Sequence, residues 1–386
     1  MKIHVAIVSD QILPNLIPAL MERPGKVYLV CSEEMHRRGL DSRAKKLLEG
    51  IPVQIMADAP SVGLGAIRKY ATQLLAEIRQ SHPEAEIVFN ATGGTKLMSL
   101  GFVEVFRESA GEIIYTDTHH RLIEVFPDAK GCAPPARPMQ DVLDIPTYLA
   151  AQGFRYLGAR SDDRAWVAEA ARREAICRYL GKAVSALQPF IGCLNGLANR
   201  ALNDGEELCQ PVQAFETVPG RNWSEALNRI AAASLLEWRR GERQIRFTDT
   251  ESALFLRGGW LEEYAWQVVR DEKVRDVRCS VRVQGDDASR ATNEFDVLAC
   301  HGNELLVIEC KTLRIKEENE SNIAYKVESL GKQVRGLFGE TWLLSARQPS
   351  DPLLKRAQRA QIRLFGPKQL PSLAITVRRW KVHKRD

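Results

Sequence analysis

The sequence lacks the marks of several common protein classes. None of its eight cysteines forms a C-x-x-C pair, so their spacing fits neither a zinc site nor a compact disulfide framework. We interpret the cysteines as free thiols. No apolar run approaches the ~20 residues that cross a bilayer, and residues 1–10 resemble a strand rather than a signal peptide. We therefore expect a cytoplasmic protein with no membrane partner.

Two nucleotide-binding motifs are also missing. No G-x-G-x-x-G follows the first predicted strand, which argues against a nicotinamide-dependent dehydrogenase. The G-x-x-x-x-G-K spacing of a P-loop is absent as well. No repeat of fixed period occurs, so a solenoid is not indicated.

Length and charge give a first positive indication. The 386 residues, 45% of them hydrophobic, suit two or three globular domains at roughly 100–200 residues each. Net charge is +5, but residues 311–386 hold 17 lysines and arginines against 7 aspartates and glutamates. A basic region of this size suits a polyanionic partner such as nucleic acid, and a solvated basic tail fits the charge equally well.

The N-terminal third alternates strand-like and helix-like segments. We predict strands at residues 3–8, 26–31, 52–56, 87–90, 112–117 and 122–126, and helices at 11–21, 33–49, 64–81 and 95–109. This alternation predicts an α/β domain with a mainly parallel sheet. Ligands of such sheets bind beyond the carboxyl ends of the strands.

The middle and the C-terminal part have different patterns. After a proline-rich stretch at 132–138, residues 145–203 and 223–240 read as helical, and 244–247 with 253–256 as a hairpin, which suggests a winged-helix-like connector. A helix at 260–270, strands at 275–283, 294–300 and 305–312, a helix at 321–338 and a strand at 342–345 form a second α/β core. The predicted domains are 1–140, 141–255 and 256–386.

One predicted hairpin carries acidic and basic residues. Gly-Asn at residues 302–303 is a good two-residue turn. With the turn there, Asp296 lies opposite Glu309, and Glu294 lies opposite Lys311. The two-residue period also places Glu309 and Lys311 on one face. Two carboxylates and an ammonium group therefore converge.

This convergence predicts a metal-dependent active site. Two close carboxylates repel unless a cation lies between them, and Mg²⁺ or Mn²⁺ prefers oxygen ligands. A neighbouring ammonium can orient a water or stabilise charge on a phosphate. The alternative is an exposed face with a Glu309–Lys311 salt bridge. The apolar run at 305–308 reads as a buried central strand, where unpaired charges are costly, and this favours the functional interpretation.

The hairpin residues match the PD-(D/E)xK motif of restriction-endonuclease-like nucleases. Asp296 stands for the first acid, and Glu309-Cys310-Lys311 stands for (D/E)-x-K. The resemblance also implies a glutamate on the preceding helix, for which Glu262 is preferred over Glu263. Phe295 replaces the family's proline. The implied catalytic residues are Glu262, Asp296, Glu309 and Lys311, and the implied metal ligands are Asp296, Glu309 and Glu262.

The segment at 90–98, Asn-Ala-Thr-Gly-Gly-Thr-Lys-Leu-Met, follows a strand and opens a helix. Its two glycines permit close backbone approach, and free amides at a helix start favour phosphate. The segment resembles the ligand loop of CARF domains, the Rossmann-like nucleotide-sensing modules of CRISPR-associated proteins. The resemblance implies ligand contacts from Thr92, Gly93, Gly94, Thr95 and Lys96, and from a second loop, Ser9, Asp10 and Gln11. Simple helix caps would also explain both loops.

The combination resembles the ancillary effector nucleases of type III CRISPR systems. It implies a Rossmann-like CARF domain, a connector and a restriction-endonuclease-like α/β domain. It further implies a homodimer that binds cyclic oligoadenylate, usually cyclic tetra-adenylate. Binding would activate endonuclease cleavage of single-stranded DNA or RNA, or nicking of duplex DNA, with Mn²⁺ or Mg²⁺.

Two other functions remain open. A ligand-responsive transcription regulator without catalysis would use the connector and C-terminal domain only to bind nucleic acid, and would leave the hairpin's acidic residues unexplained. An enzyme that degrades its own cyclic nucleotide could use His119 and His120. Paired surface histidines are more often only solvated.

Overall fold

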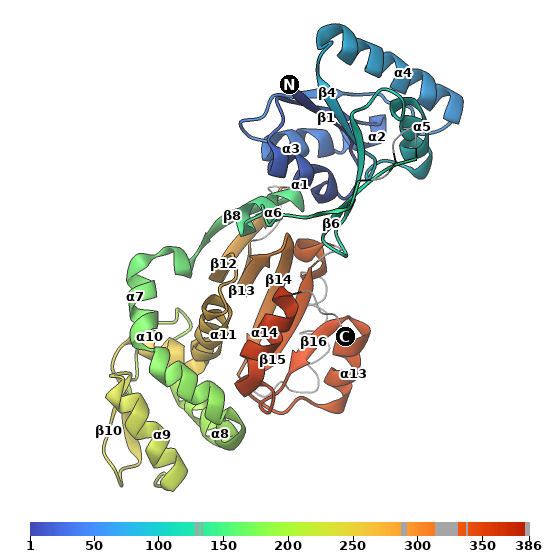
Figure 1. Cartoon of the computed structure of the whole chain (residues 1–386). Helices are drawn as coiled ribbons and strands as arrows, with labels where there is room; N and C mark the ends of the chain where they lie inside the picture. The colour runs from blue at the N-terminus through green and yellow to red at the C-terminus, as the bar shows by residue number, and fades with distance from the viewer. Residues whose placement is uncertain (128–130, 133, 287–291, 313–330, 337–338, 383–386) are drawn as a thin grey trace. The chain divides into compact units, whose positions relative to one another are not determined.

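The computed structural model describes residues 1–127, 131–132, 134–286, 292–312, 331–336 and 339–382. The chain forms two compact units, Met1–Phe154 and Arg155–Asp386 (Figure 1). Both are α/β structures, which confirms the predicted fold class. The three-part division at 140 and 255 stays a prediction.

The first unit is built on a seven-stranded sheet, in the order β3-β2-β1-β4-β5-β6-β7. Its strands are β1 (Lys2–Ile7), β2 (Lys26–Val30), β3 (Val53–Met56), β4 (Glu86–Asn90), β5 (Glu112–Asp117), β6 (Leu122–Val125) and β7 (Arg137–Pro138). The first five are parallel and the last two antiparallel. All six predicted strands are confirmed. Because β1 lies between β2 and β4, the strand order reverses at β1, and the crevice beyond β1 and β4 is where such sheets bind ligands.

The described residues of this unit also form the helices α1 (Leu13–Glu22), α2 (Glu33–Arg37), α3 (Leu40–Leu47), α4 (Leu64–Ser81), α5 (Lys96–Phe106) and α6 (Ile145–Ala151). The side chains of α4 and α5 pack in one core cluster with β1 and β4, where Phe89, Phe102 and Phe106 stack. The prediction of one helix over 33–49 is wrong. Gly39, at φ +70°, separates α2 from α3, because a left-handed residue cannot continue a right-handed helix.

The second unit holds a six-stranded sheet in the order β16-β15-β14-β13-β12-β8. Its strands are β8 (Phe154–Ala159), β12 (Asp276–Gly285), β13 (Asn293–His301), β14 (Glu304–Lys311), β15 (Glu340–Ser345) and β16 (Ile362–Phe365). The strands predicted at 275–283, 294–300, 305–312 and 342–345 are confirmed as β12, β13, β14 and β15. β8 was predicted as helix, which is wrong. β8 is an edge strand that pairs with β12, more than 100 residues later in the sequence. The local sequence therefore gives no sign of this pairing.

Helix α11 (Trp260–Asp271) packs on one face of this sheet, and α8 (Glu174–Ala201) packs against α11. Both helices share the main core cluster of the unit. They approach closely: a Cβ on Gly181 of α8 would lie 2.3 Å from the ring of Tyr264. Helices α7 (Arg164–Arg172), α13 (Asp351–Arg359) and α14 (Leu373–Lys381) also belong to this unit. The predicted helix at 321–338 falls largely outside the described residues, of which 331–335 are helical.

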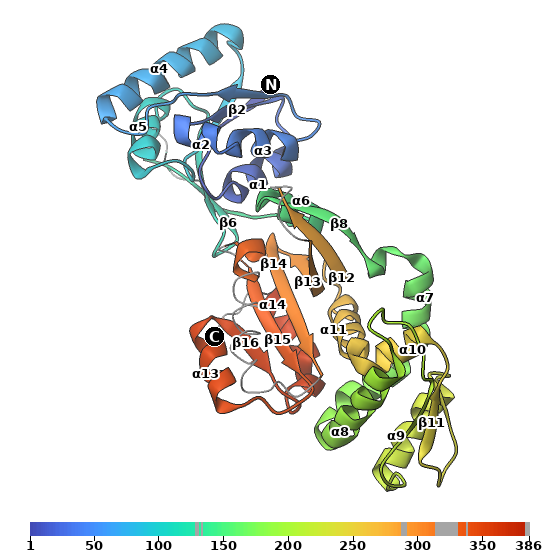
Figure 2. The same ribbon diagram turned by 180° about the vertical axis from the view of Figure 1, so that it is seen from behind.

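A small module follows α8: β9 (Val212–Ala214), α9 (Arg221–Ala232), β10 (Leu236–Trp238), β11 (Gln244–Phe247) and α10 (Thr250–Leu254) (Figure 2). Its sheet order, β10-β11-β9, suits a winged helix. The predicted helix over 223–240 is too long. The observed helix α9 ends before Ser234, whose backbone is left-handed at φ +59°. The predicted pairing of 244–247 with 253–256 is wrong, because Asp249 caps α10 and β11 pairs with β10 and β9.

No helix in the described part of the chain is long and apolar enough to cross a membrane.

Candidate functional site

The predicted hairpin is formed by β13 and β14. Paired residues run from Val297–Ile308 to His301–Glu304, in the predicted register. Just beyond this ladder, the Asp296 carboxylate accepts a hydrogen bond of 2.6 Å from the Cys310 backbone amide. The predicted pairing of Glu294 with Lys311 lies outside the ladder, and Glu294 pairs with Arg282 of β12.

The structure brings Asp296, Glu309 and Lys311 together. The Lys311 ammonium nitrogen lies 3.2 Å from Glu309 Oε2 and 3.9 Å from Asp296 Oδ2. Both carboxylates are less than a fifth exposed. Burial lowers the pKa of Lys311, but the charges of Asp296 and Glu309 outweigh it and raise that pKa above its ordinary value. Lys311 is therefore a cation at neutral pH and not a proton acceptor.

Two adjacent glutamates of α11 line the same cavity but have different partners. Glu263 is buried and makes a two-pronged ion pair with Arg173, at 2.7 and 3.1 Å. Glu262 lines a cavity of about 310 Å³ together with Ser280 and Glu294. Burial, followed by the negative charge of Asp296, raises the pKa of Glu262 to about 8. Glu262 therefore belongs to the electrostatic environment of the hairpin acids, and Glu263 has a structural partner.

Sequence reasoning missed two features beside this hairpin. Ser280 lies on β12 between the pairs Cys279–Val297 and Val281–Phe295, in a left-handed conformation of φ +52° beside Asp296. Such strain in a non-glycine residue costs about 1–3 kcal/mol and is concentrated at functional sites. Beyond Lys311, the buried Asn195 of α8 donates a 2.9 Å hydrogen bond to Thr312. Nothing in the local sequence predicts the conformation of Ser280 or the Asn195–Thr312 hydrogen bond.

The donor set fits a divalent cation. Among the described residues no three histidine, cysteine or acidic side chains are placed to hold one metal ion as they stand. Mg²⁺, however, is usually bound by one or two carboxylates, with water and substrate phosphate completing its shell. Asp296 and Glu309 meet that need. Burial and then the charge of Asp296 raise the pKa of Glu262, and a cation beside these carboxylates would stabilise their ionised forms.

In the first unit, the predicted ligand loop follows β4 and is pressed against β1. A Cβ on Gly93 would lie 1.9 Å from the Ile7 carbonyl oxygen, and Gly94 has φ +79°. Both positions therefore require glycine. The glycines keep the loop's backbone next to the carboxyl end of β1.

The two threonines of the loop are engaged within the protein. The Thr92 hydroxyl donates to Asn90 at 2.6 Å and accepts from the Thr116 amide at 2.7 Å. The Thr95 hydroxyl caps α5 by accepting from Met98 N at 3.2 Å. Lys96 is exposed and makes no ion pair with the described residues. The groups available to a ligand here are the backbone amides and the lysine.

The second loop lies after the neighbouring strand, β1. Ser9 donates to the Gln11 carbonyl at 3.2 Å, and Asp10 pairs with Arg38 at 2.5 Å. The side-chain oxygen of Gln11 is buried and has no hydrogen-bond partner in the described chain. Sequence reasoning missed Asn15, which donates to the Ile7 carbonyl at 2.7 Å and supports this loop from α1.

Comparison with known proteins agrees with this arrangement. The family model described as Card1 CARF domain matches residues 3–148, and the one described as Card1-like, endonuclease domain, matches residues 249–384. No match is found among curated proteins.

Two solved structures share the fold over almost the whole chain. Protein VC1899 from Vibrio cholerae has a TM-score of 0.84 at 22% identity, covering 99% of this chain and 98% of its own. Can2 from Sulfobacillus thermosulfidooxidans, solved in complex with cyclic tetra-adenylate, has a TM-score of 0.74 at 24% identity, covering 97% and 99%. The chain therefore belongs to the family of Card1-like proteins, in which a CARF domain is joined to an endonuclease domain.

Proposed function

We propose that this chain is a nuclease of type III CRISPR defence that is activated by cyclic oligoadenylate and depends on a divalent metal. The observation that carries the proposal is the placement of Lys311 between Asp296 and Glu309 inside the segment that the endonuclease family matches. The substrate that suits it is single-stranded DNA or RNA, with nicking of duplex DNA as a related activity.

The hairpin residues have distinct chemical roles. Asp296 and Glu309, with Glu262 as the third carboxylate, would hold Mn²⁺ or Mg²⁺ through oxygen ligands. A bound metal ion lowers the pKa of water and polarises the phosphoryl group. Lys311 donates hydrogen bonds to the non-bridging phosphate oxygens, where negative charge develops during cleavage. The hydrogen bond from Cys310 N fixes the Asp296 carboxylate in place.

The first unit supplies the regulatory site. The amides at the start of α5 and the Lys96 ammonium suit the phosphates of a cyclic oligonucleotide. The buried acceptor of Gln11 suits the exocyclic amino group of adenine. Cyclic tetra-adenylate is the ring we propose, since the Can2 structure was solved with it.

We also propose a homodimer joined through the first unit. Val62, Leu64, Leu97 and Leu100, at the starts of α4 and α5 beside the ligand loop, are 75%, 41%, 45% and 61% exposed. Large apolar side chains gathered on a surface mark contact sites. A second copy would cover them and bring two ligand loops together.

The test is a cleavage assay with labelled single-stranded DNA and RNA, Mn²⁺ or Mg²⁺, and cyclic tetra-adenylate present or absent. We expect cleavage only with ligand and metal together. Glu309→Ala should abolish it while ligand binding, measured by calorimetry, stays unchanged. Lys96→Ala should weaken ligand binding and activation.

Two results would contradict this division of roles. Loss of ligand binding in Glu309→Ala would contradict the assignment of ligand binding to the first unit and cleavage to the second. Absence of cleavage under every ligand and metal would favour the transcription regulator, for which the winged-helix-like order of β9, α9, β10 and β11 gives a specific basis. Binding to duplex DNA would then be measured.

A further inference from the structure

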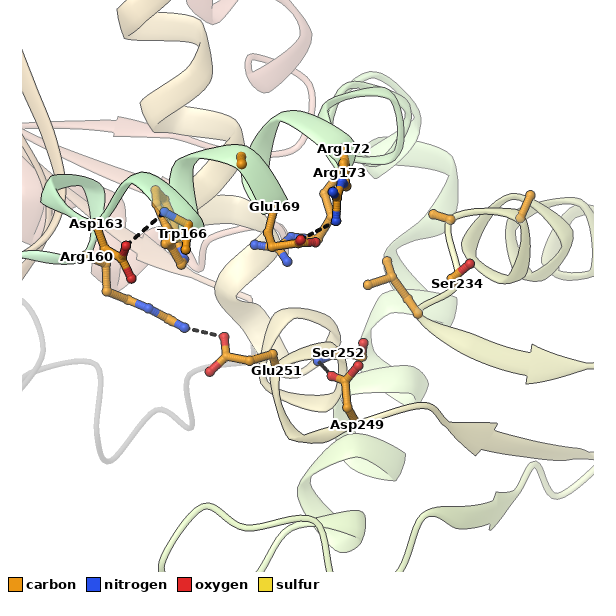
Figure 3. A pocket seen from close by; sticks show the side chains of 15 residues that line it. Arg160, Asp163, Trp166, Glu169, Arg172, Arg173, Ser234, Asp249, Glu251 and Ser252 are labelled. Carbon is orange, nitrogen blue, oxygen red and sulfur yellow. Dashed lines mark hydrogen bonds and ion pairs between the residues drawn. The ribbon is translucent and has the colours of Figure 1, made fainter.

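The second unit holds a large cavity that the proposed chemistry does not use. It measures about 950 Å³ and lies among α7, the end of α9 and the start of α10 (Figure 3). This volume is at the upper end of the range for small-molecule sites. It shares three lining residues, Arg160, Trp166 and Glu251, with the cavity of about 310 Å³ that contains Glu262 and Glu294. The two cavities therefore adjoin, and together they extend from Glu262 to the end of α9.

Trp166 at this junction has an unsatisfied hydrogen-bond donor. Its side chain is 9% exposed, and its indole nitrogen has no partner within the described chain. A buried donor without a partner costs about 1–3 kcal/mol, and at Trp166, which lines both cavities, an acceptor on a bound ligand would remove that cost. The Trp166 ring packs edge-on against Trp266, with ring centroids 5.2 Å apart, which fixes its position.

Arg160 and Glu251 form an ion pair across the same junction (Figure 3). Their side chains are 44% and 57% exposed, so the pair contributes little to stability and opens at small cost. The guanidinium also lies 5.8 Å from the Trp166 ring centroid. A phosphate can replace Glu251, because arginine binds phosphate in the same two-pronged manner as carboxylate.

The other acidic side chains around the larger cavity have hydrogen-bond or ion-pair partners. Asp163 and Asp249 accept hydrogen bonds from the first turns of α7 and α10, and Glu169 pairs with Arg172. Arg172 offsets the charge of Glu169, and the positive ends of α7 and α10 offset part of the charge of Asp163 and Asp249, which reduces the repulsion of a nucleotide.

From these observations we propose that the two cavities form a subsite for the substrate strand next to the cleaved phosphate. Trp166 donates its indole N–H to an acceptor on a base, and Arg160 exchanges Glu251 for a phosphate of the same strand. The ligand is a nucleotide unit of single-stranded DNA or RNA. This subsite rests on the proposed nuclease function.

The test measures binding of fluorescent single-stranded DNA and RNA to Glu309→Ala protein with ligand and metal, so that no strand is cut. Trp166→Phe removes only the indole N–H and should weaken binding about tenfold, the value of one hydrogen bond. Arg160→Gln should weaken binding similarly and reduce the slope of log affinity against log salt by about 0.7. With a strand of abasic sugar phosphates, Trp166→Phe should have no effect and Arg160→Gln should keep its effect.

Matched controls exist for both variants. Trp380→Phe removes an equally unpartnered, buried indole N–H that lines neither cavity. Arg178→Gln removes an arginine that is 40% exposed and paired with Glu174 and Asp271 outside both cavities. Both should bind substrate as the parent does.

The outcomes separate the subsite from the nuclease. Unchanged binding in Trp166→Phe and Arg160→Gln, or an equal loss in the controls, would overturn the subsite. Cleavage that persists in Glu309→Ala, measured separately with the otherwise unchanged chain, would overturn the proposed function instead.

Discussion

At the scale of single residues, the neighbours Glu262 and Glu263 illustrate how environment divides roles. The sequence allowed either as the catalytic acid, and preferred Glu262. Both glutamates line the same cavity, but the structure pairs Glu263 with the buried Arg173 and places Glu262 in the field of the Asp296 carboxylate. That distinction depends on Arg173, 90 residues away, and no local pattern could supply it.

We expect these two glutamates to differ in their effect on stability. Glu263→Gln leaves the Arg173 guanidinium buried without its counter-charge, so the free energy of unfolding should fall by about 3–5 kcal/mol. Glu262→Gln removes a carboxyl group that is already disfavoured as an anion, and stability should stay level or rise. Urea denaturation checks this, and equal losses in both variants would contradict it.

Glu22 predicts a pH dependence of stability. Hydrogen bonds from His4, and then from Lys2, outweigh partial burial and lower the pKa of Glu22 from 4.5 to about 2. A depressed folded-state pKa stabilises the protein above pH 4.5, here by about 3 kcal/mol, and the effect is lost as pH falls towards 2. The stability difference between the wild type and Glu22→Gln should therefore shrink by about half between pH 7 and pH 3.

Urea denaturation at both pH values tests this, with Glu86→Gln as the control. Glu86 faces the same lysine but is 56% exposed, so its removal should matter little. If the stability difference between the wild type and Glu22→Gln does not change with pH, the folded protein does not stabilise the ionised Glu22 carboxylate.

At the scale of elements, predictions succeeded where the signal was local. The β13–β14 register follows from the turn at 302–303 and the alternation around it, so the convergence of Asp296, Glu309 and Lys311 was predictable. The edge strand β8 and the short strand β10 were not, since their pairing depends on distant partners. Thr92 and Thr95 were chosen for their hydroxyls, yet these hydroxyls shape the loop.

The loop after β4 should not tolerate a side chain at its first glycine. Gly93→Ala places a Cβ 1.9 Å from the Ile7 carbonyl, so the loop must move, at a cost of about 1–3 kcal/mol. We expect lower thermal stability and weaker binding of cyclic tetra-adenylate. Gly65→Ala on α4 is the control: no atom lies within 4 Å of its Cβ, so stability should stay level or rise. Equal thermal stability and equal ligand binding in the two variants would contradict the need for a glycine at position 93.

At the scale of the whole molecule, self-association should depend on the first unit. Leu97→Glu with Leu100→Glu puts charge on the exposed apolar group beside the ligand loop, and should convert a dimer to monomers in light scattering. Ile375→Glu, on α14 of the second unit and 53% exposed, should leave the dimer intact. A dimer that survives the double substitution would place the interface elsewhere.

Helix α8 sets a limit on how this chain can be divided. It runs for 28 residues, or about 42 Å, and its buried stripe belongs to the same core as α11. The same helix packs against β9 and α9 of the small module. The matched endonuclease segment begins at residue 249, after this helix. A fragment cut there would expose the face of α11 that α8 covers. The endonuclease segment therefore depends for part of its hydrophobic core on a helix that precedes it in the chain.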